Sequence, residues 1–104
     1  MPRARTHFAD FEAKASEVTQ VLRAIANERR LRILCKLVEC GEANARTLAE
    51  SVGLSPSALS QHLTKMRDEG IVNYRREGQT LWYRLSEPRI ELLLVQLQRL
   101  YSRH

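Results

Sequence analysis

Residues that interrupt or cross-link a chain are scarce in this sequence. Its 104 residues include four glycines, three prolines and two cysteines. This composition excludes a fibrous repeat, and two cysteines are too few for the disulfide framework of a small secreted protein. A chain of this length can bury one hydrophobic core but is too short for two typical domains. We therefore expect residues 1–104 to form a single domain, with residues 1–10 as a flexible N-terminal arm.

Long apolar segments are missing as well. No run approaches the roughly 20 residues that a membrane-spanning helix needs. The first residues, MPRARTHF, lack the apolar core of a secretory signal. We therefore expect a cytoplasmic protein that makes no membrane contact.

The sequence also lacks the motifs of common enzymes. It has no glycine-rich phosphate loop, and Ser57 or Ser60 with His62 forms a polar helix face without a supporting carboxylate at a sensible geometry. We therefore predict that the protein is not an enzyme and holds no cofactor.

Positive charge, in contrast, is in excess. Lysine and arginine number 17 against 12 aspartates and glutamates, which gives a net charge of +5. Such a balance favours a polyanionic partner such as nucleic acid, although many basic proteins bind none. The charge therefore needs support from a binding motif.

Apolar residues recur with helical spacing over three segments of the first half of the chain. Residues 28–40 follow Asn27 as a helix cap and stop at Gly41, and residues 45–52 stop at Gly53. Residues 8–26 carry an amphipathic period, defined by Phe11, Ala15, Val18, Leu22 and Ile25. We predict one helix over each segment.

A fourth helix follows a short turn. Ser55 can cap it, and Pro56 occupies its first position, where a missing N–H has no consequence. Helix, tight Gly-containing turn and helix form the helix-turn-helix signature. After Gly70, the segments IVNYRR and TLWYRL are rich in β-branched and aromatic residues and predict a hairpin. Residues from Glu87 onward predict a last helix.

The fourth helix, within LSPSALSQHLTKMRDEG, has an unusual polar side. A surface helix normally carries Glu and Lys there, whereas this one carries short hydroxyl and amide groups. Such side chains can approach base edges in a major groove without long flexible stems. The predicted base-reading residues are Ser57, Ser60 and Gln61, with Thr64 on the same face. His62 borders the apolar side, so we expect it to pack or orient the helix. A capped surface helix without a DNA-binding role is the alternative interpretation.

Three segments together resemble a known family. They are LRAIANERRLRILCKL, LAESVGLSPSALSQHLTKMRDEGIV and RREGQTLWYRL, and over residues 18–101 the chain resembles the ArsR/SmtB family of small dimeric bacterial repressors. The resemblance implies a mainly α (α+β) winged helix-turn-helix fold with the element order α-α-α-α-β-β-α. It also implies a repressor that binds a palindromic operator in double-stranded DNA and is released by an effector.

Phosphate contacts need cations and polar groups at the rim of the groove. The predicted phosphate-contacting residues are Lys65, Arg75 and Arg76, with Arg46 and Thr47 on the preceding helix, and Gln79 is a further predicted DNA-binding residue. Gly78 lets the hairpin tip turn, so that Gln79 or Arg76 could reach the minor groove. A hairpin that only closes the core is the alternative. Trp82 and Arg84 are interpreted as structural.

The last helix is apolar around most of its circumference. A helix on a small domain normally buries one stripe, so we expect a second subunit to cover the remaining surface. The result would be a homodimer formed through the terminal helices. Its predicted interface residues are Leu22, Ile90, Leu93, Leu94, Leu97 and Tyr101.

The resemblance leaves the effector open. Metal sensors of the family carry a Cys-X-Cys pair near the third helix, or acidic and His ligands on the last helix. Here residues 42–45 read EANA, and the last helix has only His104 at the chain end. A tetrahedral site needs four such ligands. We therefore predict no metal site, with His7 and His104 at a dimer edge as the one loose alternative.

Cys35 is the leading candidate for a thiol sensor, with Cys40 second. Its context, LRILCKL, resembles the persulfide- and redox-responsive branch of the family, in which a second-helix cysteine pairs with one on the last helix. That second position is Ser102 here, and serine cannot form a sulfur bridge. The dithiol switch has been lost, or Ser102 replaces a natural cysteine, or Cys40 serves instead.

Helix geometry argues against a bridge between the two cysteines. Five helical residues turn about 500°, so Cys35 and Cys40 point roughly 140° apart and cannot bridge in an intact helix. A buried, inert Cys35 and an incidental thiol at Cys40 form the alternative interpretation.

Two other functions stay open. A metal-responsive repressor of the same family would bind zinc or copper in stoichiometric amounts. A winged-helix protein-interaction module would bind its partner regardless of salt, whereas a repressor loses DNA affinity steeply as salt rises.

Overall fold

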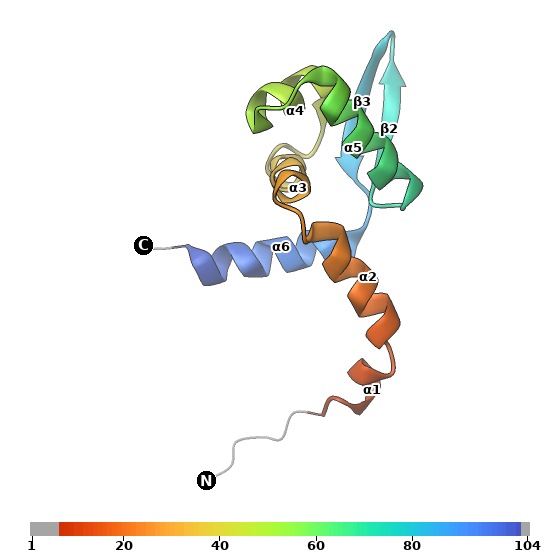
Figure 1. Cartoon of the computed structure of the whole chain (residues 1–104), viewed down its shortest axis with the longest axis vertical. Helices are drawn as coiled ribbons and strands as arrows, with labels where there is room; N and C mark the ends of the chain where they lie inside the picture. Colours follow the sequence, from red (N-terminus) through yellow and green to blue (C-terminus); the bar gives the residue numbers. More distant parts are fainter. Residues whose placement is uncertain (1–6, 103–104) are drawn as a thin grey trace.

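The computed structural model describes residues 7–102, which form helices around one end of a small antiparallel sheet (Figure 1). In chain order the elements are α1 Ala9–Glu12, α2 Ala15–Ile25, α3 Glu28–Cys40, β1 Ala43–Asn44, α4 Ala45–Val52, α5 Pro56–Asp68, β2 Val72–Glu77, β3 Thr80–Leu85 and α6 Pro88–Tyr101. The winged helix-turn-helix order predicted from the sequence is confirmed, with one short helix and one short strand added.

The helix predicted over residues 8–26 is in fact two helices. The amide of Lys14 donates to Phe11 O at 2.9 Å, which closes α1 with an i→i−3 bond, and α2 starts at Ala15. The apolar period runs through this joint and both Ala13 and Lys14 are ordinary helix formers, so nothing in the sequence marks it. Helix α1 begins at Ala9, so the last two positions of the expected arm are helical, and the flexibility of the arm stays a prediction. Residues 1–6 lie outside the described residues.

Local capping sets the ends of the central helices. Asn27 Oδ1 accepts from Arg30 N at 3.0 Å at the start of α3, and Ser55 Oγ accepts from Ala58 N at 3.2 Å at the start of α5. Gly53 ends α4 with φ +70°, a left-handed conformation that favours glycine. These short-range contacts explain why the bounds of these helices could be predicted.

The sheet has the strand order β1-β3-β2. Strands β2 and β3 form the predicted hairpin, in which Glu77 pairs with Thr80 across a two-residue turn. Gly78, the first residue of this turn, has φ +65°. Gln79, the second, does not have positive φ, because among the described residues only glycines do. This combination matches a type II′ turn. Strand β1 was not predicted, because a two-residue strand offers no alternation to recognise.

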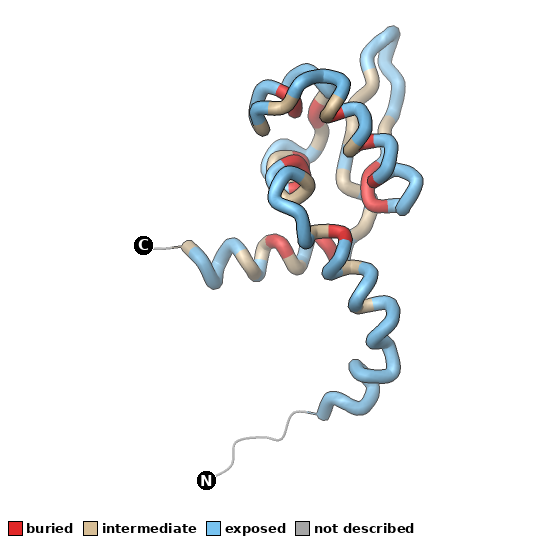
Figure 2. Tube along the Cα trace, viewed as in Figure 1, coloured by how far each residue is buried: buried red, intermediate tan, exposed pale blue. Residues whose placement is uncertain are grey.

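The hydrophobic core lies where α3, α4, α5, β2 and the first half of α6 meet (Figure 2). Its largest fully buried side chains are Ile33, Leu34, Leu37, Leu48, Leu59, Leu63, Met66, Val72 and Ile90. Ile90 and Leu94 are only 1% and 5% exposed within one copy of the chain. Their prediction as interface residues is therefore wrong, because they have almost no surface left to offer a second subunit.

Two helical arms extend from this body. The α1–α2 segment and the second half of α6 diverge from it in Figure 1, and the Cα radius of gyration is 16.1 Å, against about 13 Å for a compact domain of 100 residues. Most of the large exposed apolar side chains lie here, with Phe8 and Phe11 at α1, Leu22 on α2, and Leu100 and Tyr101 at the end of α6, while exposed Leu92 lies in the first half of α6. The arms are thus the apolar surface that one copy leaves uncovered.

Candidate nucleic-acid interface

Helix α5 has two chemically distinct sides. Leu59, Leu63 and Met66 are at most 1% exposed and fix the helix to the core. The opposite side, which we call the polar face, is exposed and consists of Ser57, Ser60, Gln61 and Thr64. All four predicted positions of this face thus lie together on one exposed surface of the second helix of the helix-turn-helix.

The end of α5 is tied to α3 by an ion pair. Arg30 Nη1 and Nη2 donate to Glu69 Oε1 and Oε2 at 3.0 and 3.1 Å, and Nη1 also lies 3.4 Å from Ala24 O at the end of α2. The Arg30 side chain is only 12% exposed. Two parallel charge-assisted bonds fix both distance and orientation. The pair therefore sets how the polar face is presented.

A second contact joins α5 to the hairpin. The Arg67 guanidinium lies 4.3 Å from the centre of the Tyr74 ring, and Tyr74 packs edge-to-face on Tyr83 with centroids 5.4 Å apart. Partial burial raises the pKa of the Tyr83 hydroxyl, so the phenol stays neutral. Tyr74 thus marks the side of the hairpin that faces α5.

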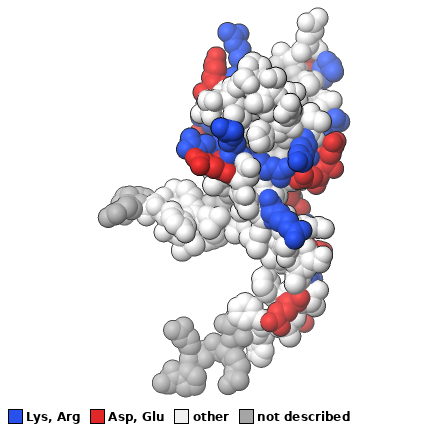
Figure 3. Space-filling view, in the orientation of Figure 1, with Lys and Arg blue, Asp and Glu red and all other residues white. Residues whose placement is uncertain are grey.

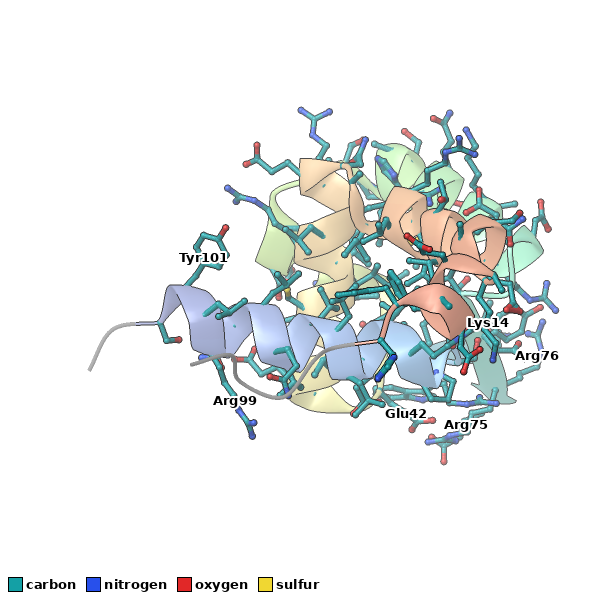
Figure 4. All side chains as sticks on the ribbon, turned by 90° about the horizontal axis from the view of Figure 1, so that it is seen from below. Lys14, Glu42, Arg75, Arg76, Arg99 and Tyr101 are labelled. Carbon is teal, nitrogen blue, oxygen red and sulfur yellow. The ribbon has the colours of Figure 1, made fainter. Side chains whose placement is uncertain are left out.

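The predicted phosphate-contacting residues are spread along the same end of the molecule. Thr47, Lys65, Arg76 and Gln79 are exposed, and Arg46 is exposed with its Nε 3.7 Å from Glu50. Figure 3 shows lysine and arginine side chains interspersed with acidic ones over this body, whereas α6 presents no charged atoms on the face drawn. On this face, charge is therefore separated from α6, whereas Arg99 projects from another side of the same helix in Figure 4.

Arg75 differs from the other hairpin cations because its guanidinium is already paired. Arg75 Nε donates to both carboxylate oxygens of Glu42 at 3.0 and 3.2 Å, and Nη2 donates to Glu42 Oε1 at 3.0 Å. Arg75 holds the pKa of Glu42 below its usual range. Sequence reasoning missed Glu42, and likewise Glu69, because each pairs with an arginine more than 30 positions away.

His62 lies in an open cleft bounded by α2, α5 and the start of α6, beside Arg30 and Lys65. Its pKa is lowered, first by partial burial and then by the nearby charges of Arg30, Arg29 and Lys65. A neutral imidazole at the border of the core is consistent with a packing role. The prediction that His62 orients α5 stays a prediction.

Comparison with known proteins gives this geometry a family. The family model described as bacterial regulatory protein, arsR family, matches residues 27–74. The transcriptional activator HlyU of Vibrio cholerae is 41% identical over 98 residues, which cover 94% of this chain and 90% of HlyU. The chain belongs to the ArsR family.

Solved structures of ArsR-type regulators agree with the fold. The transcriptional repressor BigR from Xylella fastidiosa matches with a TM-score of 0.87 at 32% identity, covering 95% of this chain and 100% of BigR. Reduced HlyU from Vibrio cholerae matches with a TM-score of 0.81 at 41% identity, covering 90% of this chain and 98% of HlyU. The ArsR-family chain is thus a DNA-binding transcriptional regulator and not an enzyme, as the sequence predicted.

The two cysteines of this ArsR-family chain are free thiols, and both residues are exposed. The interpretation of Cys35 as a buried residue is therefore wrong, because the outer side of α3 is not covered within one copy. Partial shielding of the thiol, and then the charge of Glu39, raise the pKa of Cys35. Ser102 Oγ accepts from Gln98 Nε2 at 2.6 Å, within the last turn of α6 and just beyond it.

Potential metal ligands stay apart in the described part of the chain. Between residues 7 and 102, no three His, Cys, Asp or Glu side chains come together in a way that could hold a metal ion. The loose pairing of His7 with His104 involves a residue outside the described range. None of the helices described is both long and apolar enough to cross a bilayer.

Proposed function

We propose that this protein is a homodimeric repressor that inserts α5 of each subunit into successive major grooves of a palindromic operator. The observation that carries the proposal is the division of α5. Its apolar side is buried in the core, while Ser57, Ser60 and Gln61 stay exposed on the opposite side. Gln can pair with adenine through two hydrogen bonds, and Ser accepts or donates.

Phosphate contacts would fix this register. Lys65 extends the polar face, Arg46 and Thr47 sit at the start of α4, and Arg76 and Gln79 lie near the tip of the hairpin. These groups are exposed and surround the polar face on three elements, which supports an electrostatic grip on both sides of a groove. Because the ligand is chromosomal DNA, we place the protein in the cytoplasm.

The exposed apolar arms support the dimer. Leu22 on α2 is 49% exposed, and on α6 Leu92, Leu100 and Tyr101 are 67%, 75% and 82% exposed. Leu93 and Leu97 are partly exposed beside them. Apolar surface of this size on a small chain is normally covered by a partner, and a second copy covers it in a closed two-fold assembly. Two half-sites about 34 Å apart would then face two α5 helices.

For the effector we propose only a chemical class, a thiol-reactive signal. Cys35 remains the candidate thiol sensor and Cys40 the secondary one, since BigR and HlyU are relatives of this chain and α3 presents Cys35 at the surface. The raised pKa of Cys35 disfavours the thiolate, which is the reactive form. The signal would therefore have to be an electrophilic sulfur species or oxidant strong enough to react with a thiol that is mostly protonated.

Selection of bound fragments from sheared genomic DNA, followed by fluorescence anisotropy, tests the proposal. We expect enriched fragments to contain a palindrome bound tighter than a scrambled duplex by at least about 10³-fold at physiological salt. Gln61→Ala should lower operator affinity by about five- to 100-fold for each half-site and leave random-duplex affinity unchanged, with Gln96→Ala on α6 as the matched control. Equal affinity for operator and scrambled DNA would reject the proposal.

Two other outcomes would indicate a different function. A salt-insensitive complex with another protein would indicate an interaction module. Tight binding of zinc or copper in stoichiometric amounts would indicate a metal sensor.

A further inference from the structure

The hairpin places its two consecutive arginines on opposite sides. Successive side chains of a strand alternate between the two faces of a sheet. Tyr74 contacts Arg67 of α5, so its side of β2 faces the recognition helix. Arg76 shares that side, whereas Arg75 lies on the far side. Arg76 has no ion-pair partner within residues 7–102, which leaves its charge available.

Strand β1 places Glu42, the residue just before it, on the side of the sheet that carries Arg75. Ala43 pairs with Tyr83 and is only 3% exposed, so it points into the core. Glu42, the preceding residue, therefore points to the far side, and its carboxylate meets the Arg75 guanidinium across β3. Figure 4 shows the two side chains beside one another at the edge of the molecule. The fold itself thus positions the pair.

The ion pair with Glu42 occupies the guanidinium N–H groups with which Arg75 would otherwise bind a phosphate. Arginine binds a phosphate or a carboxylate through the same planar fork of N–H groups. Three hydrogen bonds of 3.0–3.2 Å to Glu42 use Nε and Nη2, and Nη1 faces Glu77 Oε1 at 3.8 Å. The charge of Arg84 also acts on Glu42. Two guanidiniums and two carboxylates make this corner neutral, and a neutral corner releases no counterions from DNA.

We propose that Glu42 acts as an internal phosphate substitute that withholds Arg75 from the DNA backbone, so that Arg75 positions the hairpin while Arg76 makes its phosphate contact. The proposal rests on the DNA-binding function proposed above. It makes Glu42 a determinant of affinity and salt dependence, because an additional phosphate contact would strengthen binding to every sequence alike. Arg75 lies over the Trp82 ring with its guanidinium carbon 5.9 Å from the ring centre, which holds the base of the hairpin in place.

The salt dependence of DNA binding tests this proposal. The slope of log K against log salt changes by about 0.9 for each phosphate group that the protein neutralises. We expect Arg75→Met to leave the slope at its wild-type value. Arg76→Met, the matched control, should make it shallower by about 0.9 per subunit, or about 1.8 for the dimer. Glu42→Gln keeps the shape of the side chain but removes its charge. It should make the slope steeper by about 0.9 per subunit, or about 1.8 for the dimer, and tighten binding to random duplex. The double variant Glu42→Gln, Arg75→Met should return the slope to the wild-type value.

Each outcome is decisive. A shallower slope for Arg75→Met in the otherwise wild-type chain, or an unchanged slope for Glu42→Gln, overturns the proposal. A wild-type protein without salt-dependent affinity for any duplex overturns the DNA-binding proposal as well, so the two failures are distinguishable. Circular dichroism checks folding. If Glu42→Gln is unfolded, Glu42→Asp replaces it. The shortened carboxylate should partly release Arg75 and give a slope between that of the wild type and that expected for Glu42→Gln.

Discussion

The guanidinium of Arg30 and the carboxylate of Glu69 form two parallel hydrogen bonds, 3.0 and 3.1 Å long, that join the beginning of α3 to the end of the recognition helix. With its contact to Ala24 O, Arg30 ties together three helices of the fold. The pair therefore connects the α2 arm, which we assign to the dimer, to the helix assigned to the operator.

Arg30→Met should lower the free energy of unfolding by about 1–2 kcal/mol. Glu69 loses its charged hydrogen-bond donor, and Ala24 O loses a weak hydrogen bond. Urea denaturation measures the change. Arg32→Met is the matched control, since Arg32 and Glu28 form a pair 61% and 76% exposed that contributes about 0.5 kcal/mol or less. Equal effects of the two substitutions would contradict a special role for Arg30.

Leu100→Lys should weaken self-association about tenfold or more while leaving the fold intact. Leu100 is 75% exposed in one copy, so a lysine there is harmless to the monomer but would lie within the proposed interface beside Tyr101, on the arm seen in Figure 4. Sedimentation equilibrium measures the dissociation constant. Gln96→Lys adds the same charge to the same helix and serves as control. If the wild-type chain is monomeric at micromolar concentration, the dimer is rejected outright.

The stability of the protein should fall as pH drops below 6.5 because of His62. Its folded pKa lies below the unfolded value of 6.5, so the unfolded chain takes up the proton first and is favoured. Above 6.5 the imidazole is neutral in both states and adds no pH dependence. The lowered pKa values of Glu42 and Glu87 act in a separate window, below their ordinary value of 4.5.

Urea unfolding at pH 7, 6 and 5 measures this effect, and His62→Gln should flatten the curve over that interval. Gln96→Ala, which alters no titratable group, is the control and should leave the pH dependence unchanged. A His62→Gln variant with the wild-type pH dependence would show that other groups cause it.

Cys35 should react slowly with iodoacetamide at neutral pH, since its raised pKa leaves little thiolate. In a Cys40→Ser background, mass spectrometry should show slower alkylation of the folded protein than of the urea-unfolded chain, with the difference shrinking at alkaline pH. Equal rates at pH 7 would contradict the raised pKa.

Operator affinity tests whether Cys35 senses a signal. We expect polysulfide treatment to weaken operator binding by the wild-type chain and to leave the Cys35→Ser variant unaffected. Modification of α3 would alter its packing in the dimer and thereby the spacing of the two recognition helices. Identical affinities for reduced, treated and variant protein would exclude Cys35 as the sensor.

Much of the fold follows from residues close together in the chain. Asn27, Ser55 and Gly53 act on backbone groups within a few positions, so the bounds of α3, α4 and α5 could be predicted. The polar face of α5 could be predicted for the same reason, since helical spacing alone puts its members on one side. The joint at Lys14 and the strand β1 leave no such local mark.

The sequence by itself determined the elements and the chemistry of the recognition helix, because caps, turns and helical periods depend on near neighbours. Only the tertiary structure decided which side of α6 is core, with Ile90 and Leu94 inside and Leu92 and Leu100 outside. A helix that is apolar on several sides gives no indication of which side its own chain covers. The same holds for Arg75 and Glu42, which lie 33 positions apart and meet only because β1 pairs with β3.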